Sequence, residues 1–109
     1  MPGSKIFRRI TVIALSLICL EVTAAPDLQR QKELNYLLKH DCGSCHGMRL
    51  EGGLGPALKP VQLQFYSVEQ VAFTILHGRP GTPMPPWQPF LSEQDANWLA
   101  ARLKAGVRP

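Results

Sequence analysis

Three stretches of the chain carry apolar residues at helical spacing, and each begins beside a residue that can cap a helix. In the first, three leucines recur three and four positions apart within residues 28–40, which gathers them on one helix face. Asp27 precedes this stretch, and its carboxylate can accept a hydrogen bond from a free amide of the first turn. The side chains expected to face inward are those of Leu34, Leu37, Leu38 and Tyr36.

The other two stretches open with a serine and a second side-chain acceptor three positions later. Ser67 with Gln70 is a capping-box pattern, and Ser92 with Asp95 marks the start of the last helix. No alternating pattern typical of a β-strand is visible, so the sequence predicts an all-α domain of three main helices joined by loops. Residues that stop helices follow both stretches: the second ends at His77 before Gly78 and Pro80, and the last ends at Gly106.

The first 24 residues have the pattern of a secretory signal peptide. A basic segment precedes an apolar run over residues 10–20, and small residues follow it. A helix of that run would measure about 16 Å, well short of a hydrocarbon core of about 30 Å, which disfavours a membrane anchor. We expect cleavage after Ala24, which assigns residues 25–109 to the mature periplasmic domain.

Part of the charge of the chain belongs to this leader. The 109 residues carry a net charge of +4, and removal of Lys5, Arg8, Arg9 and Glu21 lowers it to +2. The remaining basic residues are scattered, which disfavours nucleic acid as a partner. The length excludes a two-domain enzyme, and a domain this small often needs a disulfide, a metal or an embedded cofactor.

The mature chain keeps two cysteines, in a C-x-x-C-H motif formed by Cys42, Cys45 and His46. In an exported protein this spacing is typical of covalent haem attachment, because two thiols on a tight turn can each add to a haem vinyl group while the next residue offers an imidazole to the iron. Three alternatives stay open. A thioredoxin-type redox pair lacks its βαβ surroundings, zinc would need His40 or His77 at irregular spacing, and the motif could arise by chance.

A glycine-rich stretch follows the motif, over residues 47–58. Glycines let the backbone approach a flat ligand, and a ligating histidine almost always donates its other ring N–H to an acceptor. The carbonyl of Pro56 is the candidate acceptor for His46. A phosphate-binding loop is disfavoured because no Lys-Ser or Lys-Thr pair follows the glycines, whereas a plain turn stays open.

Met84 is the candidate for a second axial ligand. It lies among four prolines, which make a stiff loop able to hold a sulfur against a metal. Met48 stands two residues after His46 and cannot reach the opposite face of the ring. Two alternatives stay open, namely that Met84 only fills the core or that His40 or His77 is the ligand.

Taken together, these features resemble a small class I cytochrome c over nearly all of the mature chain. More narrowly, the sequence around the motifs is similar to that of the small periplasmic cytochromes c encoded with the nitrite reductase that carries c-type and d-type haems. The resemblance implies one haem c linked through Cys42 and Cys45, with His46 and Met84 as axial ligands. One departure is Leu38, where class I cytochromes often have an aromatic residue. The segments that carry the resemblance are residues 41–50, 52–58 and 77–87 and the C-terminal helix.

The implied function is one-electron transport without catalysis, because two protein ligands would leave no position open on the iron. Electrons would pass to nitrite reductase in denitrification, through weak docking of a monomer at an exposed haem edge. Arg49, Arg79 and Trp87 are candidates to bind the haem propionates. The residues expected to form an apolar shell round the haem are Leu54, Leu58, Phe65, Phe73 and Trp87.

Two further functions stay open. The protein could assist the maturation of d-type haem, since an assembly factor and a carrier would use the same haem site. If Met84 is not bound, an open iron position would instead suit a gas sensor or a weak peroxidase, with His77 as the nearby candidate for a distal histidine.

Overall fold

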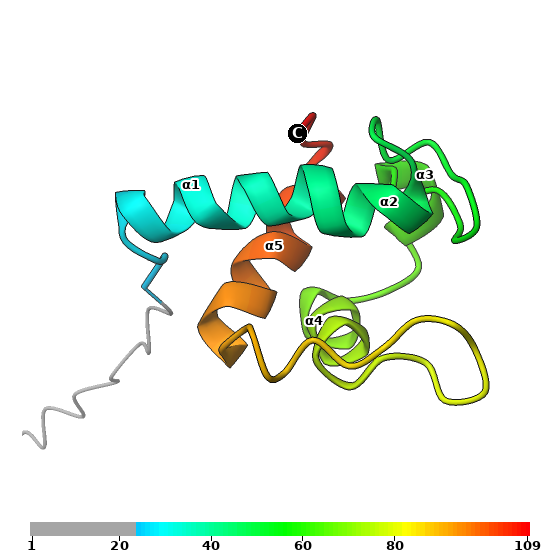
Figure 1. Cartoon of the computed structure of the whole chain (residues 1–109). Helices are drawn as coiled ribbons and strands as arrows, with labels where there is room; N and C mark the ends of the chain where they lie inside the picture. The colour runs from blue at the N-terminus through cyan, green and yellow to red at the C-terminus, as the bar shows by residue number, and fades with distance from the viewer. Residues whose placement is uncertain (1–23) are drawn as a thin grey trace, which may run out of the picture.

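The computed structural model describes residues 24–109, all helix and loop with no strand in that part of the chain (Figure 1). The proposed signal peptide, residues 1–24, falls almost wholly outside the described residues, and no helix within them is long and apolar enough to cross a membrane. The elements are α1 (Leu28–Leu37), η1 (Leu38–Cys42), α2 (Gly43–His46), α3 (Pro60–Leu63), α4 (Val68–His77) and α5 (Glu93–Ala105).

The first three elements form one continuous helical rod rather than a helix that ends at His40 (Figure 1). A π-helical turn, in which the Gly43 amide donates to the Leu38 carbonyl, carries the chain from α1 into α2. The helix predicted over residues 28–40 therefore continues past its expected end, and Cys42 lies within the rod. The rod stops at Gly47, whose positive φ of 89° takes the backbone out of the helix.

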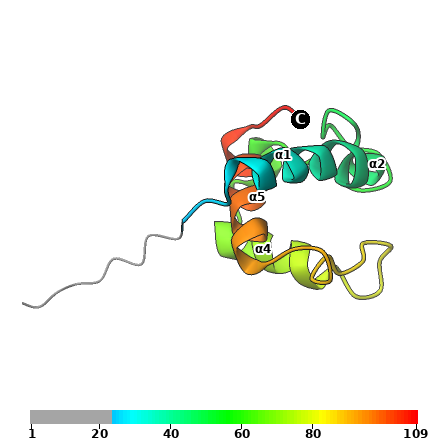
Figure 2. The same ribbon diagram turned by 60° about the vertical axis from the view of Figure 1, so that its left-hand side comes forward.

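The rod crosses α5, and α4 packs against α5 to complete the core (Figures 1 and 2). Leu34 and Leu38 are buried as expected, and Leu37 packs against the core, but Tyr36 is 66% exposed. The prediction for Tyr36 was wrong because it lies two residues from both buried leucines, about 200° round the helix from each. The other buried apolar residues are Leu50, Leu63, Val71, Ala72, Leu76, Leu91, Ala96, Leu99, Ala100 and Leu103.

The helix caps formed as the sequence predicted. The Asp27 carboxylate accepts from the Arg30 amide at 2.8 Å, and both serines take part in reciprocal capping boxes. The short helix α3 was not predicted, since its single turn starts at Pro60 and carries one buried leucine. A proline at the first position suits a helix because its missing N–H would be unpaired there anyway.

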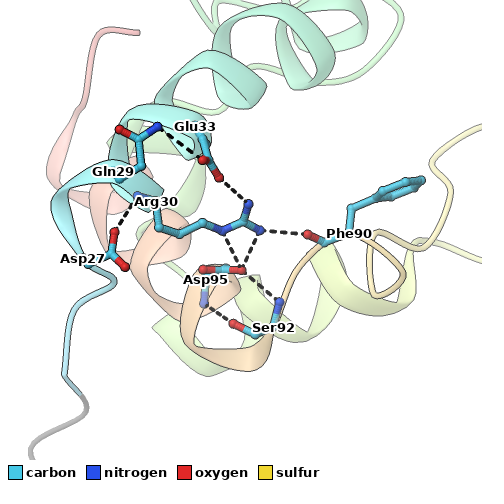
Figure 3. A network of polar contacts seen from close by, with 7 residues as sticks. All are labelled: Asp27, Gln29, Arg30, Glu33, Phe90, Ser92 and Asp95. Atoms are coloured by element: carbon cyan, nitrogen blue, oxygen red, sulfur yellow. Dashed lines mark hydrogen bonds and ion pairs between the residues drawn. The ribbon is translucent and has the colours of Figure 1, made fainter.

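An ionic network fixes the start of α1 against the start of α5 (Figure 3). Arg30 Nη2 donates to Asp95 Oδ2 at 2.9 Å and to the carbonyl of Phe90 at 2.9 Å, while Nη1 bonds Glu33 at 3.0 Å. Burial by itself would raise the pKa of Asp95, but the hydrogen bonds from Arg30 and Ser92 outweigh it and hold that pKa below its usual value. The carboxylate therefore stays charged and joins the two helices at neutral pH.

Candidate functional site

A cavity of about 370 Å³ lies among the end of the rod, the glycine-rich loop and the loop that follows α4. Figure 2 shows α2 and this last loop on the same side of the molecule. The volume is in the usual range for a small-molecule or cofactor site. The residues of the sequence-predicted site that line it are Cys42, Cys45, His46, Leu54, Pro56, Leu58, Arg79, Met84 and Trp87.

His46 presents one ring nitrogen for ligation. Its side chain is only 9% exposed, and Nδ1 lies 2.7 Å from the carbonyl oxygen of Pro56. A carbonyl can only accept, so Nδ1 must carry the proton and Nε2 keeps its lone pair. The hydrogen bond expected from the sequence is thus present, and it selects the tautomer that a metal ligand requires.

The glycine-rich loop holds this imidazole by close backbone approach. A Cβ atom at Gly55 would lie 2.7 Å from both Cε1 and Nδ1 of His46, so only glycine fits there. The amides of Gly52 and Gly55 donate to the carbonyls of His46 and Cys45, both at 2.8 Å, which pairs carbonyls at the end of the rod. Leu50 is fully buried at a φ of 59°, a conformation that a non-glycine residue holds only where packing enforces it.

The two thiols are free and lie in different surroundings. Cys42 is partly buried, whereas Cys45 is exposed. Burial, and next the charge of Asp41, raise the pKa of Cys42 to about 11, which opposes the thiolate that a redox-exchange or zinc site needs. No group of three or more histidine, cysteine or acidic residues within residues 24–109 could hold a metal.

Met84 is the only methionine in the described chain that lines the cavity. Its backbone is held by the Arg79 amide, which donates to the Met84 carbonyl at 3.2 Å, and by the Thr82 hydroxyl, which accepts from the Met84 amide at 3.3 Å. Met48 is exposed and outside the lining. The rival ligands His40 and His77 are also exposed and are absent from the cavity wall.

The apolar wall differs in part from the one expected. Leu54, Leu58 and Trp87 line the cavity, but Phe65 and Phe73 are 81% and 64% exposed and do not. The prediction for these two was wrong because Phe65 lies in the turn after the unforeseen α3, and Phe73 lies about 100° and 200° round α4 from Thr74 and Ile75, which line the cavity. Leu38, which the sequence assigned to the helix core, lines the cavity instead, together with Ile75, Leu99 and Leu103.

Of the three residues expected to bind the haem propionates, two line the cavity. Arg79 and Trp87 are in its wall, whereas Arg49 is exposed and outside it. An apolar cavity with two thiols and a lone-pair imidazole on one segment, and a thioether and a guanidinium on another, fits a covalently bound haem.

The chain is similar to known c-type cytochromes. Residues 29–101 match the family model described as "Cytochrome C oxidase, cbb3-type, subunit III". The chain is 58% identical over 81 residues to cytochrome c55X of Pseudomonas aeruginosa, which covers 74% of this chain and 68% of the relative.

Two solved structures are also similar. The c-type cytochrome NirC superimposes with a TM-score of 0.75 at 55% identity, over 77% of this chain and all of that one. The dihydro-heme d1 dehydrogenase NirN, in complex with DHE, gives 0.61 at 36% identity, over 69% of this chain and 16% of that protein.

Proposed function

The chain belongs to the cytochrome c family, and from that premise we propose that it holds a single haem c, attached through Cys42 and Cys45, as a one-electron carrier of the periplasm. The observation that carries the proposal is the meeting of four residues at one cavity. Cys42, Cys45 and His46 come from the end of the rod, and Met84 comes from the loop after α4.

Each of these side chains has a definite task. A haem in this cavity supplies an Fe(III)/Fe(II) couple. His46 would hold the iron through Nε2 while the Pro56 carbonyl keeps the proton on Nδ1, and the Met84 sulfur would supply the second protein ligand. A thioether ligand raises the reduction potential, and the leucine wall favours the state of lower charge, because water is excluded. With His46 and Met84 both bound, the chain would leave no position on the iron for a substrate.

Arg79 is the proposed partner of the haem propionates, with the indole of Trp87 as a second donor. Both line the cavity, and a guanidinium forms strong charge-assisted hydrogen bonds with carboxylates. Arg49 is not assigned this task, since it lies outside the cavity wall. At the other edge, exposed Cys45 and Leu54 mark where a haem would come nearest to the surface, and there we place electron entry and exit.

The proposed partner is nitrite reductase, in denitrification. A second candidate follows from the similarity to part of NirN. A domain of this fold forms about one-sixth of a dehydrogenase that acts on dihydro-haem d1, so a separate chain of the same fold could accept electrons from that reaction. Stopped-flow mixing of the oxidised or reduced carrier with each purified enzyme separates the two. Fast oxidation by nitrite reductase supports the first, and fast reduction by the dehydrogenase with its substrate supports the second.

The axial ligation is tested by absorption spectra of the holoprotein and of two variants. Wild-type protein should show the weak far-red sulfur-to-iron band when oxidised, and Met84→Ala should lose it. Met48→Ala is the matched control, because Met48 is exposed and outside the cavity, and it should keep the band. A wild-type protein without the band that binds carbon monoxide as readily as Met84→Ala would refute the carrier function and favour a sensor or peroxidase.

A further inference from the structure

We propose that Gly78 is the positioning residue for the Met84 ligand, an inference that rests on the function proposed above. Gly78 follows α4 directly and is buried. Its amide donates to the Thr74 carbonyl at 2.9 Å, which fixes it to the last turn of the helix. Its φ of 67° and ψ of −167° belong to a conformation that essentially only glycine adopts.

The segment that carries Met84 lies directly against this glycine. A Cβ atom at position 78 would lie 2.7 Å from the Met84 carbonyl oxygen, 2.7 Å from the Pro85 carbonyl carbon and 2.8 Å from the Pro86 nitrogen. All three are backbone atoms, so no side-chain rotation could make room. The whole segment over residues 84–86 would have to move.

The far side of the segment is also fixed to α4. The amides of Trp87 and Gln88 donate to the carbonyls of Ile75 and Leu76, both at 3.1 Å. Two prolines restrict the backbone between this attachment and Met84. A displacement caused at Gly78 therefore cannot be absorbed beyond residue 86 and must be taken up at Met84, whose side chain lines the cavity.

A second glycine in the same loop makes it possible to distinguish the steric effect of a Cβ atom from the effect of an unfavourable φ. Gly81 also has a positive φ, of 79°, but nothing lies within 4 Å of a Cβ atom built there. Alanine at either position meets an unfavourable φ, whereas only alanine at Gly78 meets the Met84 segment. Gly81→Ala is thus the matched control for Gly78→Ala.

The test compares the two holoproteins with wild type, with circular dichroism to verify that the helices are retained. We expect Gly78→Ala to lose the far-red sulfur-to-iron band and, when reduced, to bind carbon monoxide with about tenfold higher affinity. Gly81→Ala should keep the band and the wild-type affinity. The inference is overturned if Gly78→Ala keeps the band, or if both variants lose it equally. A wild type without the band would instead refute the proposed ligation itself.

A second pair of variants covers the case in which Gly78→Ala does not fold. Adding Pro86→Ala restores rotation about φ at residue 86, so the segment can yield while the helices pack. The double variant Gly78→Ala/Pro86→Ala should fold without the far-red band, and Gly81→Ala/Pro86→Ala should keep it. A band of wild-type strength in the first double variant contradicts the inference.

Discussion

Replacing Asp95 by alanine should destabilise the protein more than any change at its exposed neighbours. The buried Oδ2 atom accepts three hydrogen bonds, from Arg30 Nη2 at 2.9 Å, Arg30 Nε at 3.3 Å and the Ser92 amide at 3.1 Å. A bond to a charged group contributes about 1.5–3 kcal/mol, and a helix cap about 0.5–2 kcal/mol. Because the Arg30 side chain is 34% exposed and water can solvate it, the expected cost lies toward the lower end, at about 2–4 kcal/mol.

The assay is thermal unfolding of the holoprotein, followed by circular dichroism. For a domain of this size the expected cost lowers the melting temperature by about 10–25 °C. Glu33→Gln is the control, since Glu33 pairs with the same arginine from an exposed position and should cost less than about 1 kcal/mol. Equal melting temperatures for Asp95→Ala and Glu33→Gln would refute the assignment of Asp95 as the residue that joins α1 to α5.

The Asp95 carboxylate should also make the free energy of unfolding fall at acid pH. The pKa of Asp95 is lowered in the folded protein, so its contribution is fully present above the unfolded value of about 3.9 and is lost as the pH falls through the lower folded value. The difference in stability between wild type and Asp95→Asn should therefore shrink below about pH 4. A difference that is constant from pH 7 to pH 3 would contradict this reasoning.

Three further predictions concern the histidine side of the cavity, the core and the leader. Gly55→Ala should lower the yield of covalently loaded protein and cost about 1–3 kcal/mol in thermal unfolding, because its Cβ would lie 2.7 Å from the His46 ring; a wild-type yield and melting temperature would contradict it. Leu34→Ala should cost about 2–5 kcal/mol of the free energy of unfolding measured in urea, since Leu34 is fully buried, whereas Leu28→Ala, at 76% exposure, should cost less than about 0.5 kcal/mol; similar costs would place the core elsewhere. The intact mass of protein from the periplasm should correspond to residues 25–109 plus one haem, and a mass that includes the first 24 residues would refute the signal peptide.

The features that were predicted correctly are those that depend on residues close together in the sequence. Both capping boxes formed, because each needs only two side chains three positions apart. The bond from His46 to Pro56 also formed, since a ligand's second nitrogen needs an acceptor and the glycines bring the nearby loop against the ring.

The incorrect predictions concern features that depend on packing between segments distant in the sequence. Tyr36, Phe65 and Phe73 are large and apolar enough to be assigned to the interior, but their burial depends on which helix faces and turns meet α5 or the cavity. Leu99 and Leu103 belong to the core, and only the packed structure shows that they also line the cavity. The π-helical turn could not be predicted from the sequence either, because η1 contains no glycine or proline that would indicate an irregular helix.

The continuous rod from Leu28 to His46 gives the two sides of the cavity different susceptibility to local opening. His46 ends a helix of which the other end is tied to α5, so its release requires loss of much of the domain's structure. Met84 lies in a loop that has two backbone hydrogen bonds to α4, from the amides of Trp87 and Gln88, and such a segment can open on its own. Amide hydrogen exchange should accordingly be slow along the inner turns of the rod and much faster over residues 79–88. Local unfolding would then expose the cavity first on the side of Met84.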